Sequence, residues 1–282
     1  MHRWRGLGGI SGSQHQTSEH PATTSNPASR KMVTTVLITG ANRGIGKGFV
    51  SLYLSRPDHT IIAAARDPGC WSVQGFKTLP AAQGSKILLV KVDSASNTDA
   101  LDAIKTIKAA GIDHLDLVIA NAGIVVYSQP VATLSLADLR TQFEVNTFGP
   151  VRLFQATVPL LKAARDPKFV VISSVIGSTT DAVAFSAQFG LGSYGASKAA
   201  VNHLVRRMHF ENEWLTALAL HPGAVSSDMG AAAYDALGEG AEPSVNVEDS
   251  VNGQVKLIDN ATRESISENG GFLSFDGSSL QY

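Results

Sequence analysis

Short apolar runs alternate with longer amphipathic stretches from Met32 to the end of the chain. The runs are too short for helices, and most are rich in Val, Ile and Leu, which is typical of strands buried on both faces. The predicted strands are Val33–Thr39, Thr60–Ala65, Ile87–Val92, Leu115–Ala120, Phe169–Ser173, Leu215–Leu220 and Phe272–Phe275. Between them the pattern predicts helices near residues 45–55, 98–110, 136–164, 196–212 and 247–259.

This alternation of strands and helices predicts an α/β protein with a single-domain Rossmann fold, a doubly wound parallel sheet with helices on both faces. Ser135, with Asp138 three residues later, resembles the capping arrangement at a helix start. Ligands of such sheets bind beyond the carboxyl ends of the strands, where the strand order reverses. We therefore expect the functional residues directly after the predicted strands.

The first 31 residues differ from the rest of the chain. Residues 11–29 are mainly Ser, Thr, Gln, His, Asn and Pro, and such a segment buries too little apolar surface to offset the entropy of ordering. We predict a disordered N-terminal extension over residues 1–31 and one domain over residues 32–282. The basic residues of the extension weakly resemble an organelle transit peptide, but we favour a dispensable extension with Met32 as an alternative start.

Composition narrows the function classes. Of the 282 residues, 44% are hydrophobic and 17% are charged, and the formal net charge of −1 gives no reason to expect a nucleic-acid partner. No apolar run approaches the ~18 residues of a membrane span. The one cysteine, Cys70, excludes a disulfide within the chain and a Cys-based zinc site, and no other metal-binding pattern stands out. We expect a cytoplasmic protein without a metal, with organelle targeting by residues 1–31 as the alternative.

A glycine-rich turn, TGANRGIG, follows the first predicted strand and leads into a helix. Glycines at these positions permit the tight turn and let backbone N–H groups approach a pyrophosphate, while the helix N-terminus adds partial positive charge. The turn predicts a dinucleotide site. Its candidate cofactor-binding residues are Gly40, Asn42, Arg43, Gly44, Ile45 and Gly46.

The residue at the end of the second strand indicates which dinucleotide the site binds. An acidic residue there would bind the ribose hydroxyls of NAD, whereas Arg66 suits a 2′-phosphate, which Arg43 can also reach. We therefore favour NADPH/NADP⁺, while Asp67 beside Arg66 keeps NAD as an alternative. Asp93, after the third strand, either accepts from the adenine amino group or caps a turn.

Tyr194 and Lys198 lie four residues apart at the start of a long predicted helix, so their side chains share one face. A phenol has a reference pKa near ~10, and a neighbouring cation lowers it by stabilising the phenolate. Tyr194 is therefore a candidate proton donor to a carbonyl oxygen. The same spacing is common without any chemical role, so its value depends on the other motifs.

Those motifs occur in order: the glycine turn, Asn121-Ala122-Gly123, Asn146, Ser174, the Tyr194/Lys198 pair and Pro222-Gly223. From Met32 onwards the chain thus resembles the short-chain dehydrogenase/reductase family. The resemblance implies a catalytic tetrad of Asn146, Ser174, Tyr194 and Lys198. It places Asn121, Ala122 and Gly123 beside the adenosine half of the cofactor, and Pro222, Gly223, Val225 and Ser227 near the nicotinamide, with Tyr194 and Lys198 also contacting the cofactor.

The resemblance also implies roles for the tetrad. Ser174 would hydrogen-bond the substrate carbonyl, Tyr194 would protonate it, and Lys198 would bind the nicotinamide ribose and lower the pKa of the phenol. Of the two adjacent serines we choose Ser174, because it precedes Val175-Ile176-Gly177, and we expect Ser173 to point the other way and pack.

Two segments depart from a minimal member of this family. Val175–Ser193 is several residues longer than usual and carries Phe185, Phe189 and Leu191. Ser226–Val245 is rich in small residues and holds Met229, Tyr234 and Leu237. Both predict a roomy, mostly apolar substrate pocket, the second segment acting as a lid, although these side chains could simply pack the loops.

The pieces TGANRGIGKGFV, AAARDP, VIANAGI, EVNTFGP and SYGASKAA resemble norsolorinic acid ketoreductase-type fungal proteins and their carbonyl-reductase relatives. This resemblance implies an NADPH-dependent ketoreductase acting on an aromatic polyketide, as in aflatoxin-type secondary metabolism and mycotoxin biosynthesis. The alternatives are a general carbonyl reductase, an NAD(H)-dependent alcohol dehydrogenase, and a non-catalytic NADP-binding regulator. The expected partners are a small-molecule ketone and further copies of the chain, as a homodimer or homotetramer.

Overall fold

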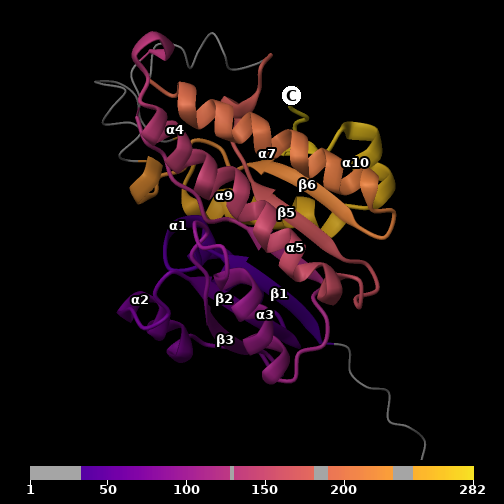
Figure 1. Ribbon diagram of the computed structural model, residues 1–282. Coiled ribbons are helices and arrows are strands. Elements are labelled where there is room, and N and C mark those ends of the chain that lie inside the picture. The colour runs from indigo at the N-terminus through magenta and orange to yellow at the C-terminus, as the bar shows by residue number, and fades with distance from the viewer. Residues whose placement is uncertain (1–32, 128–129, 181–189, 231–243) are drawn as a thin grey trace, which may run out of the picture. The chain divides into compact units, whose positions relative to one another are not determined.

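Seven parallel strands form one sheet in the order β3-β2-β1-β4-β5-β6-β7 (Figure 1). The computed structural model describes residues 33–127, 130–180, 190–230 and 244–282. The strands are β1 (Thr34–Thr39), β2 (His59–Ala65), β3 (Lys86–Lys91), β4 (Leu117–Ala120), β5 (Lys168–Ile172), β6 (Thr216–His221) and β7 (Phe272–Ser274). Every predicted strand is present with each end within two residues of its predicted position. The doubly wound parallel sheet is confirmed.

Helices connect the strands as the sequence predicts. They are α1 (Gly44–Leu54), α2 (Trp71–Gln74), α3 (Asp99–Ala109), α4 (Leu136–Phe143), α5 (Gly149–Leu161), α7 (Gly192–Glu211), α9 (Val247–Asn260) and α10 (Arg263–Asn269). Single turns η1 (Gly75–Thr78), η2 (Val131–Thr133) and η4 (Val175–Gly177) are 3₁₀, and η3 (Glu144–Phe148) is a π turn that joins α4 to α5. The short helices α2 and α10 escaped prediction because their apolar patterns are too short to show a period.

The helices cover the sheet on both faces. Leu37 and Ile62 point into one core, shared with α3, α5 and α7, whereas Val36 and Ile61 point into the other, shared with α1, α9 and α10. Successive side chains of a strand alternate between faces, so strands apolar at every position serve both cores. The predicted helix start is also confirmed, since Asp138 N donates to Ser135 Oγ at 3.3 Å.

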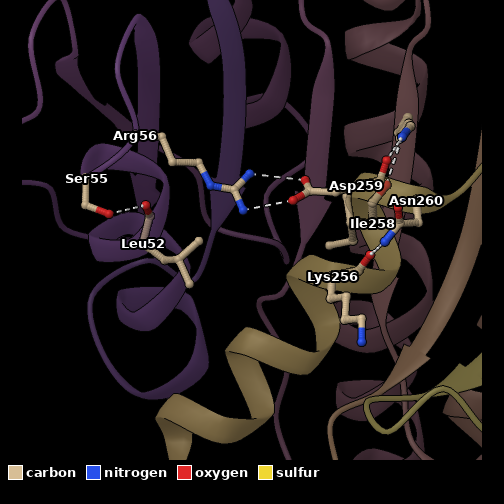
Figure 2. Close-up of polar contacts among 8 residues, drawn as sticks. Leu52, Ser55, Arg56, Lys256, Ile258, Asp259 and Asn260 are labelled. Atoms are coloured by element: carbon tan, nitrogen blue, oxygen red, sulfur yellow. Dashed lines mark hydrogen bonds and ion pairs between the residues drawn. The ribbon is translucent and has the colours of Figure 1, made fainter.

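Polar contacts connect the C-terminal end of α9 to the side of the sheet where the strands begin. Arg56, just after α1, donates from Nη1 and Nη2 to the two carboxylate oxygens of Asp259 at 3.2 and 2.8 Å (Figure 2). Lys168, the first residue of β5, donates to the carbonyl of Ile258 at 2.8 Å, and such basic residues stabilise the free carbonyls of a helix end. These contacts lie at the amino ends of the strands, away from the carboxyl ends where ligands are expected.

Within the part of the chain that the structure describes, no helix combines the length and apolar character needed to cross a bilayer. The predicted N-terminal extension lies outside the described residues.

Candidate functional site

A cavity of about 530 Å³ opens at the carboxyl ends of the strands. It lies where the strand order reverses between β1 and β4, the position at which open α/β sheets bind ligands. Its volume is within the range of small-molecule sites, roughly 300–1,000 Å³. The predicted residues that line it are Gly40, Asn42, Arg43, Gly44, Ile45, Arg66, Asp93, Asn121, Ala122, Gly123, Tyr194, Lys198, Pro222 and Ser227.

The glycine turn has the conformation that its sequence predicts. Gly40 and Gly44 have φ of 63° and 51°, in the left-handed region that side chains other than glycine rarely adopt. Gly46 does not line the cavity but allows close packing, since a β-carbon there would lie 2.2 Å from the carbonyl oxygen of Gly40. The three glycines therefore have separate tasks: two bend the turn, and the third brings α1 against it.

Two arginines line the cavity on adjacent segments. Ala41 N donates to the carbonyl of Ala64 in β2 at 3.1 Å, so the glycine turn lies beside the strand end that carries Arg66. Arg43 forms an exposed ion pair with Asp228, with 3.1 Å between Nη1 and Oδ2. The cavity thus has positive charge at the turn, partly offset by Asp228 and by Asp67.

Asn121 and Asp93 make protein contacts beside the cavity. Asn121 Nδ2 donates to the carbonyl of Thr39 at 2.9 Å, which ties the end of β4 to the end of β1. Asp93 Oδ1 accepts from Ala95 N at 3.0 Å, the turn-capping contact that we weighed against a contact with adenine. Asp93 also lines the cavity, so its geometry accommodates both interpretations.

The predicted proton-transfer residues meet in the same region. The phenol of Tyr194 hydrogen-bonds with Ser174, the last residue before η4. Lys198 is buried, and its Nζ lies 5.7 Å from the centre of the Tyr194 ring and donates to the carbonyl of Ile172 at 2.8 Å. Helix α7 begins at Gly192, so Tyr194 lies in its first turn and Lys198 one turn later on the same face.

Burial dominates the ionisation of this pair. Burial raises the pKa of Tyr194 to about 12, and the hydrogen bond from Ser174 offsets this only in part. Burial lowers the pKa of Lys198 to about 8. That Lys198 lowers the pKa of Tyr194 stays a prediction: burial is the largest cause of the raised pKa, and the Lys198 ammonium donates to the carbonyl of Ile172.

Asn146 lies behind the cavity wall, within the π turn. Its Oδ1 accepts from Ile124 N and its Nδ2 donates to Ile124 O, both at 2.9 Å, and Nδ2 also donates to Ser197 Oγ at 3.1 Å. A β-carbon at Gly123 would lie 3.3 Å from Asn146 Oδ1 and 3.7 Å from Lys198 Nζ. The four predicted catalytic residues are thus neighbours, with Asn146 bound to backbone and to α7.

Some predicted residues lie beside the cavity without lining it: Gly46, Asn146, Ser174, Gly223 and Val225. Gly223 has φ of 84° and packs under Phe275, and Val225 is buried. Ser173 is buried, with its hydroxyl donating to Asn202 in α7, but contrary to the expectation that it points away it also lines the cavity, which Ser174 does not.

Sequence reasoning missed several lining residues: Ala65, Cys70, Val92, Ser94, Ile124, Val145, Ile172 and Asp228. Ala65 and Ile172 are the last residues of their strands, and the predicted strand ends, at Ala65 and one residue later at Ser173, were a signal that could have found them. Of the expected substrate segments, Met229 lines the cavity and Leu191 is buried. Phe185, Phe189, Tyr234 and Leu237 lie outside the described residues.

Comparison with known proteins agrees with this geometry. The model of the short chain dehydrogenase family matches residues 34–237. The chain belongs to the short-chain dehydrogenase family. Within this family it is 41% identical over 252 residues to a short-chain dehydrogenase of Neurospora crassa, covering 88% of this chain and 98% of the relative. It is 42% identical over 253 residues to a norsolorinic acid ketoreductase of Dothistroma septosporum, covering 88% and 92%.

The fold is similar to that of a solved family member, the NADPH-bound carbonyl reductase from chicken fatty liver. The TM-score is 0.76 at 30% identity, over 89% of this chain and 99% of the reductase. Membership of this short-chain dehydrogenase family makes the chain an oxidoreductase, and its sequence resemblance to norsolorinic acid ketoreductase-type proteins is confirmed.

Proposed function

We propose that this chain is an NADPH-dependent ketoreductase that reduces a ketone on an aromatic polyketide to a secondary alcohol. The observation that carries the proposal is that Tyr194 and Lys198 line the same cavity as the glycine turn and both arginines. Proton-donating and anion-binding groups therefore face one ligand space. A regulator that only senses the cofactor would not need the phenol and ammonium there.

The residues around the cavity fit a nicotinamide dinucleotide. Gly40 and Gly44, both with positive φ, form the turn in front of the first turn of α1, whose backbone N–H groups and partial positive charge favour a pyrophosphate. Arg43 and Arg66 would hold a 2′-phosphate, and Lys198 would hold the nicotinamide ribose hydroxyls. When bound, the nicotinamide supplies a hydride to the carbonyl carbon.

The chain's own residues would handle the proton. Ser174 donates a hydrogen bond to the substrate carbonyl oxygen and orients it toward Tyr194. Tyr194 gives its phenolic proton to that oxygen as negative charge develops there. Because the pKa of the phenol is about 12 in the protein alone, the donor is fully protonated at neutral pH. Lys198 contributes the positive charge that stabilises the resulting phenolate.

The choice of NADPH over NADH rests on Arg43 and Arg66, and it is supported by the similar carbonyl reductase that was solved with NADPH. Replacing Arg66 with Asp removes a charge-assisted contact worth about 1.5–3 kcal/mol and adds a repulsive charge, so the preference for NADPH should fall by at least about tenfold. The measurement is kcat/KM with each cofactor, before and after the substitution. An unchanged preference would refute the phosphate role of Arg66.

The ketone class rests on resemblance to the norsolorinic acid ketoreductase of Dothistroma septosporum and on the size of the cavity. A panel of carbonyl compounds, from small aldehydes to polycyclic aromatic ketones, assayed with NADPH tests it. We expect the highest kcat/KM for polycyclic aromatic ketones. A preference for small aldehydes would indicate a general carbonyl reductase, and faster oxidation of alcohols with NAD⁺ would indicate an alcohol dehydrogenase.

The Tyr194→Phe variant tests whether the chain is an enzyme with Tyr194 as its proton donor. It removes one hydroxyl from a side chain at the cavity wall and keeps the ring. We expect turnover to fall by at least about a hundredfold, as for loss of a general acid, while NADPH affinity stays within about twofold. Full activity in this variant would show that another group donates the proton.

A further inference from the structure

A second buried amide lies beside Asn146. Gln142, on α4 four residues earlier, is completely buried, as is its partner Ser193 in the first turn of α7. Gln142 Oε1 accepts from Val126 N at 3.2 Å, and Nε2 donates to Val126 O at 3.0 Å. Nε2 also donates to Ser193 Oγ. One side chain therefore joins three segments that are 16 and 51 residues apart in sequence.

The contacts of Gln142 repeat those of Asn146. Each amide pairs with both the N–H and the carbonyl of one residue in the segment after β4: Val126 for Gln142, and Ile124 for Asn146. Each also donates to a serine of α7, four residues apart. Ser193 and Ser197, four apart in α7, face the same way, so the two amides make parallel links between the same segments.

The contact between Gln142 and Ser193 lies beside the proposed proton donor, Tyr194. Ser193 directly precedes Tyr194, and the N-cap residue of α7, Leu191, gives the helix no side-chain capping bond. The first N–H groups of a helix have no partner within it, so an uncapped first turn needs contacts from elsewhere to hold its geometry. Gln142 does not cap those N–H groups, since its Nε2 is itself a donor, but from a fully buried position it holds the Ser193 side chain of this turn.

We propose that Gln142 is a positioning residue, which holds the first turn of α7, and with it Tyr194, against the segment that follows β4. Gln142 does not line the cavity and takes no part in the chemistry. Its effect on turnover passes through Ser193 to the position of the Tyr194 phenol relative to Ser174. This inference rests on the proposed function only in taking Tyr194 as the proton donor.

The test compares Gln142→Met with Thr157→Val. Met keeps the length of the side chain but removes both hydrogen-bonding groups, leaving the N–H and carbonyl of Val126 unpaired. Thr157 is also completely buried, and its hydroxyl donates within α5, to the carbonyls of Leu153 and Phe154. Thr157→Val therefore controls for the loss of a buried polar contact away from the site.

We expect Gln142→Met to lower kcat by about tenfold on the best carbonyl substrate of the wild type, because small displacements of a catalytic group cost one to two orders of magnitude. The KM for NADPH should stay within about twofold, and Thr157→Val should keep the wild-type kcat. Ser193→Ala should reproduce the loss in kcat. The double variant should lose little more than either single variant, because both break one contact.

Amide hydrogen exchange gives a readout that needs no substrate. Gln142→Met should speed exchange over residues 192–196, and Thr157→Val should leave that turn unchanged. Gln142→Glu adds a pH test, because a buried carboxyl regains a donor only when protonated, so part of the lost kcat should return as pH falls, unlike in Gln142→Met.

Two results would overturn the inference: equal loss of kcat in Gln142→Met and Thr157→Val, or unchanged exchange in the first turn of α7. Failure of the proposed function would look different: it would appear as full activity in Tyr194→Phe, or in the wild type as a different preferred substrate or cofactor. The variant-to-wild-type ratios and the exchange data do not depend on which carbonyl compound is best.

Discussion

Tyr194 and Lys198 show how burial can dominate the ionisation of a side chain. Both are pushed toward their neutral forms, with pKa values of about 12 and about 8, because the surrounding protein replaces the water that would stabilise either charge. The Lys198 ammonium offsets part of its loss of water by donating to the carbonyl of Ile172. The protein without cofactor therefore holds a neutral acid beside a cation that releases its proton in mildly alkaline solution.

This ionisation predicts how cofactor use depends on pH. The kcat/KM for NADPH reports groups of the free enzyme, and the ammonium form of Lys198 is the form that would donate to ribose hydroxyls. Since the pKa of Lys198 is lowered to about 8, kcat/KM should be constant below that pH and fall as pH rises through it. In Lys198→Arg, which stays charged, the fall should vanish although the overall rate is lower. A fall at the same pH in the arginine variant would assign it to another group.

At the level of elements, close approach between segments determines where the site can form. The glycine turn fits between β1, β4 and α1 only because Gly46 lacks a side chain, and Asn121 ties the ends of the two strands together. The helix expected over residues 136–164 contains a π turn at Asn146, an irregularity that often occurs at functional sites. The glycine turn and the π turn at Asn146 are therefore two points where backbone geometry positions predicted site residues.

Gly46→Ala tests the close approach of α1. The added β-carbon would lie 2.2 Å from the carbonyl oxygen of Gly40, so the backbone must shift, and overpacking of this kind costs about 1–3 kcal/mol. We expect a loss of this size in the free energy of unfolding together with weaker NADPH binding. The matched control is Gly75→Ala, where a β-carbon would meet no atom within 4 Å and stability should be unchanged. Denaturant unfolding and cofactor titration of both variants would decide, and equal stability of the two would contradict the packing argument.

For the whole molecule, the sheet, both cores and the cavity are formed, among the residues that the structure describes, by the chain from Val33 onwards. Residues 32–282 also form one compact unit by their contacts. We propose that they are the complete catalytic domain and that residues 1–31 contribute to neither stability nor turnover.

A chain that starts at Met32 tests this division. We expect its thermal unfolding midpoint and its kcat/KM for the best ketone to match those of the full chain, because no group that we place in the core or site is removed. The comparison needs both proteins purified in parallel and measured in the same buffer. A lower midpoint in the shorter chain would show that the N-terminal residues stabilise the domain.

The sequence by itself determined the order and type of the main elements, the glycine turn and the set of predicted catalytic residues. These features are local: strand and helix periods, a turn that only glycine permits, and a Tyr and a Lys one helical turn apart. Only the tertiary structure decided that Gln142 meets Val126 and Ser193, and that Asn146 points to the backbone of Ile124. It also decided that burial raises the pKa of Tyr194. Desolvation and contacts between distant segments depend on the positions of all surrounding atoms, and no local pattern encodes those positions.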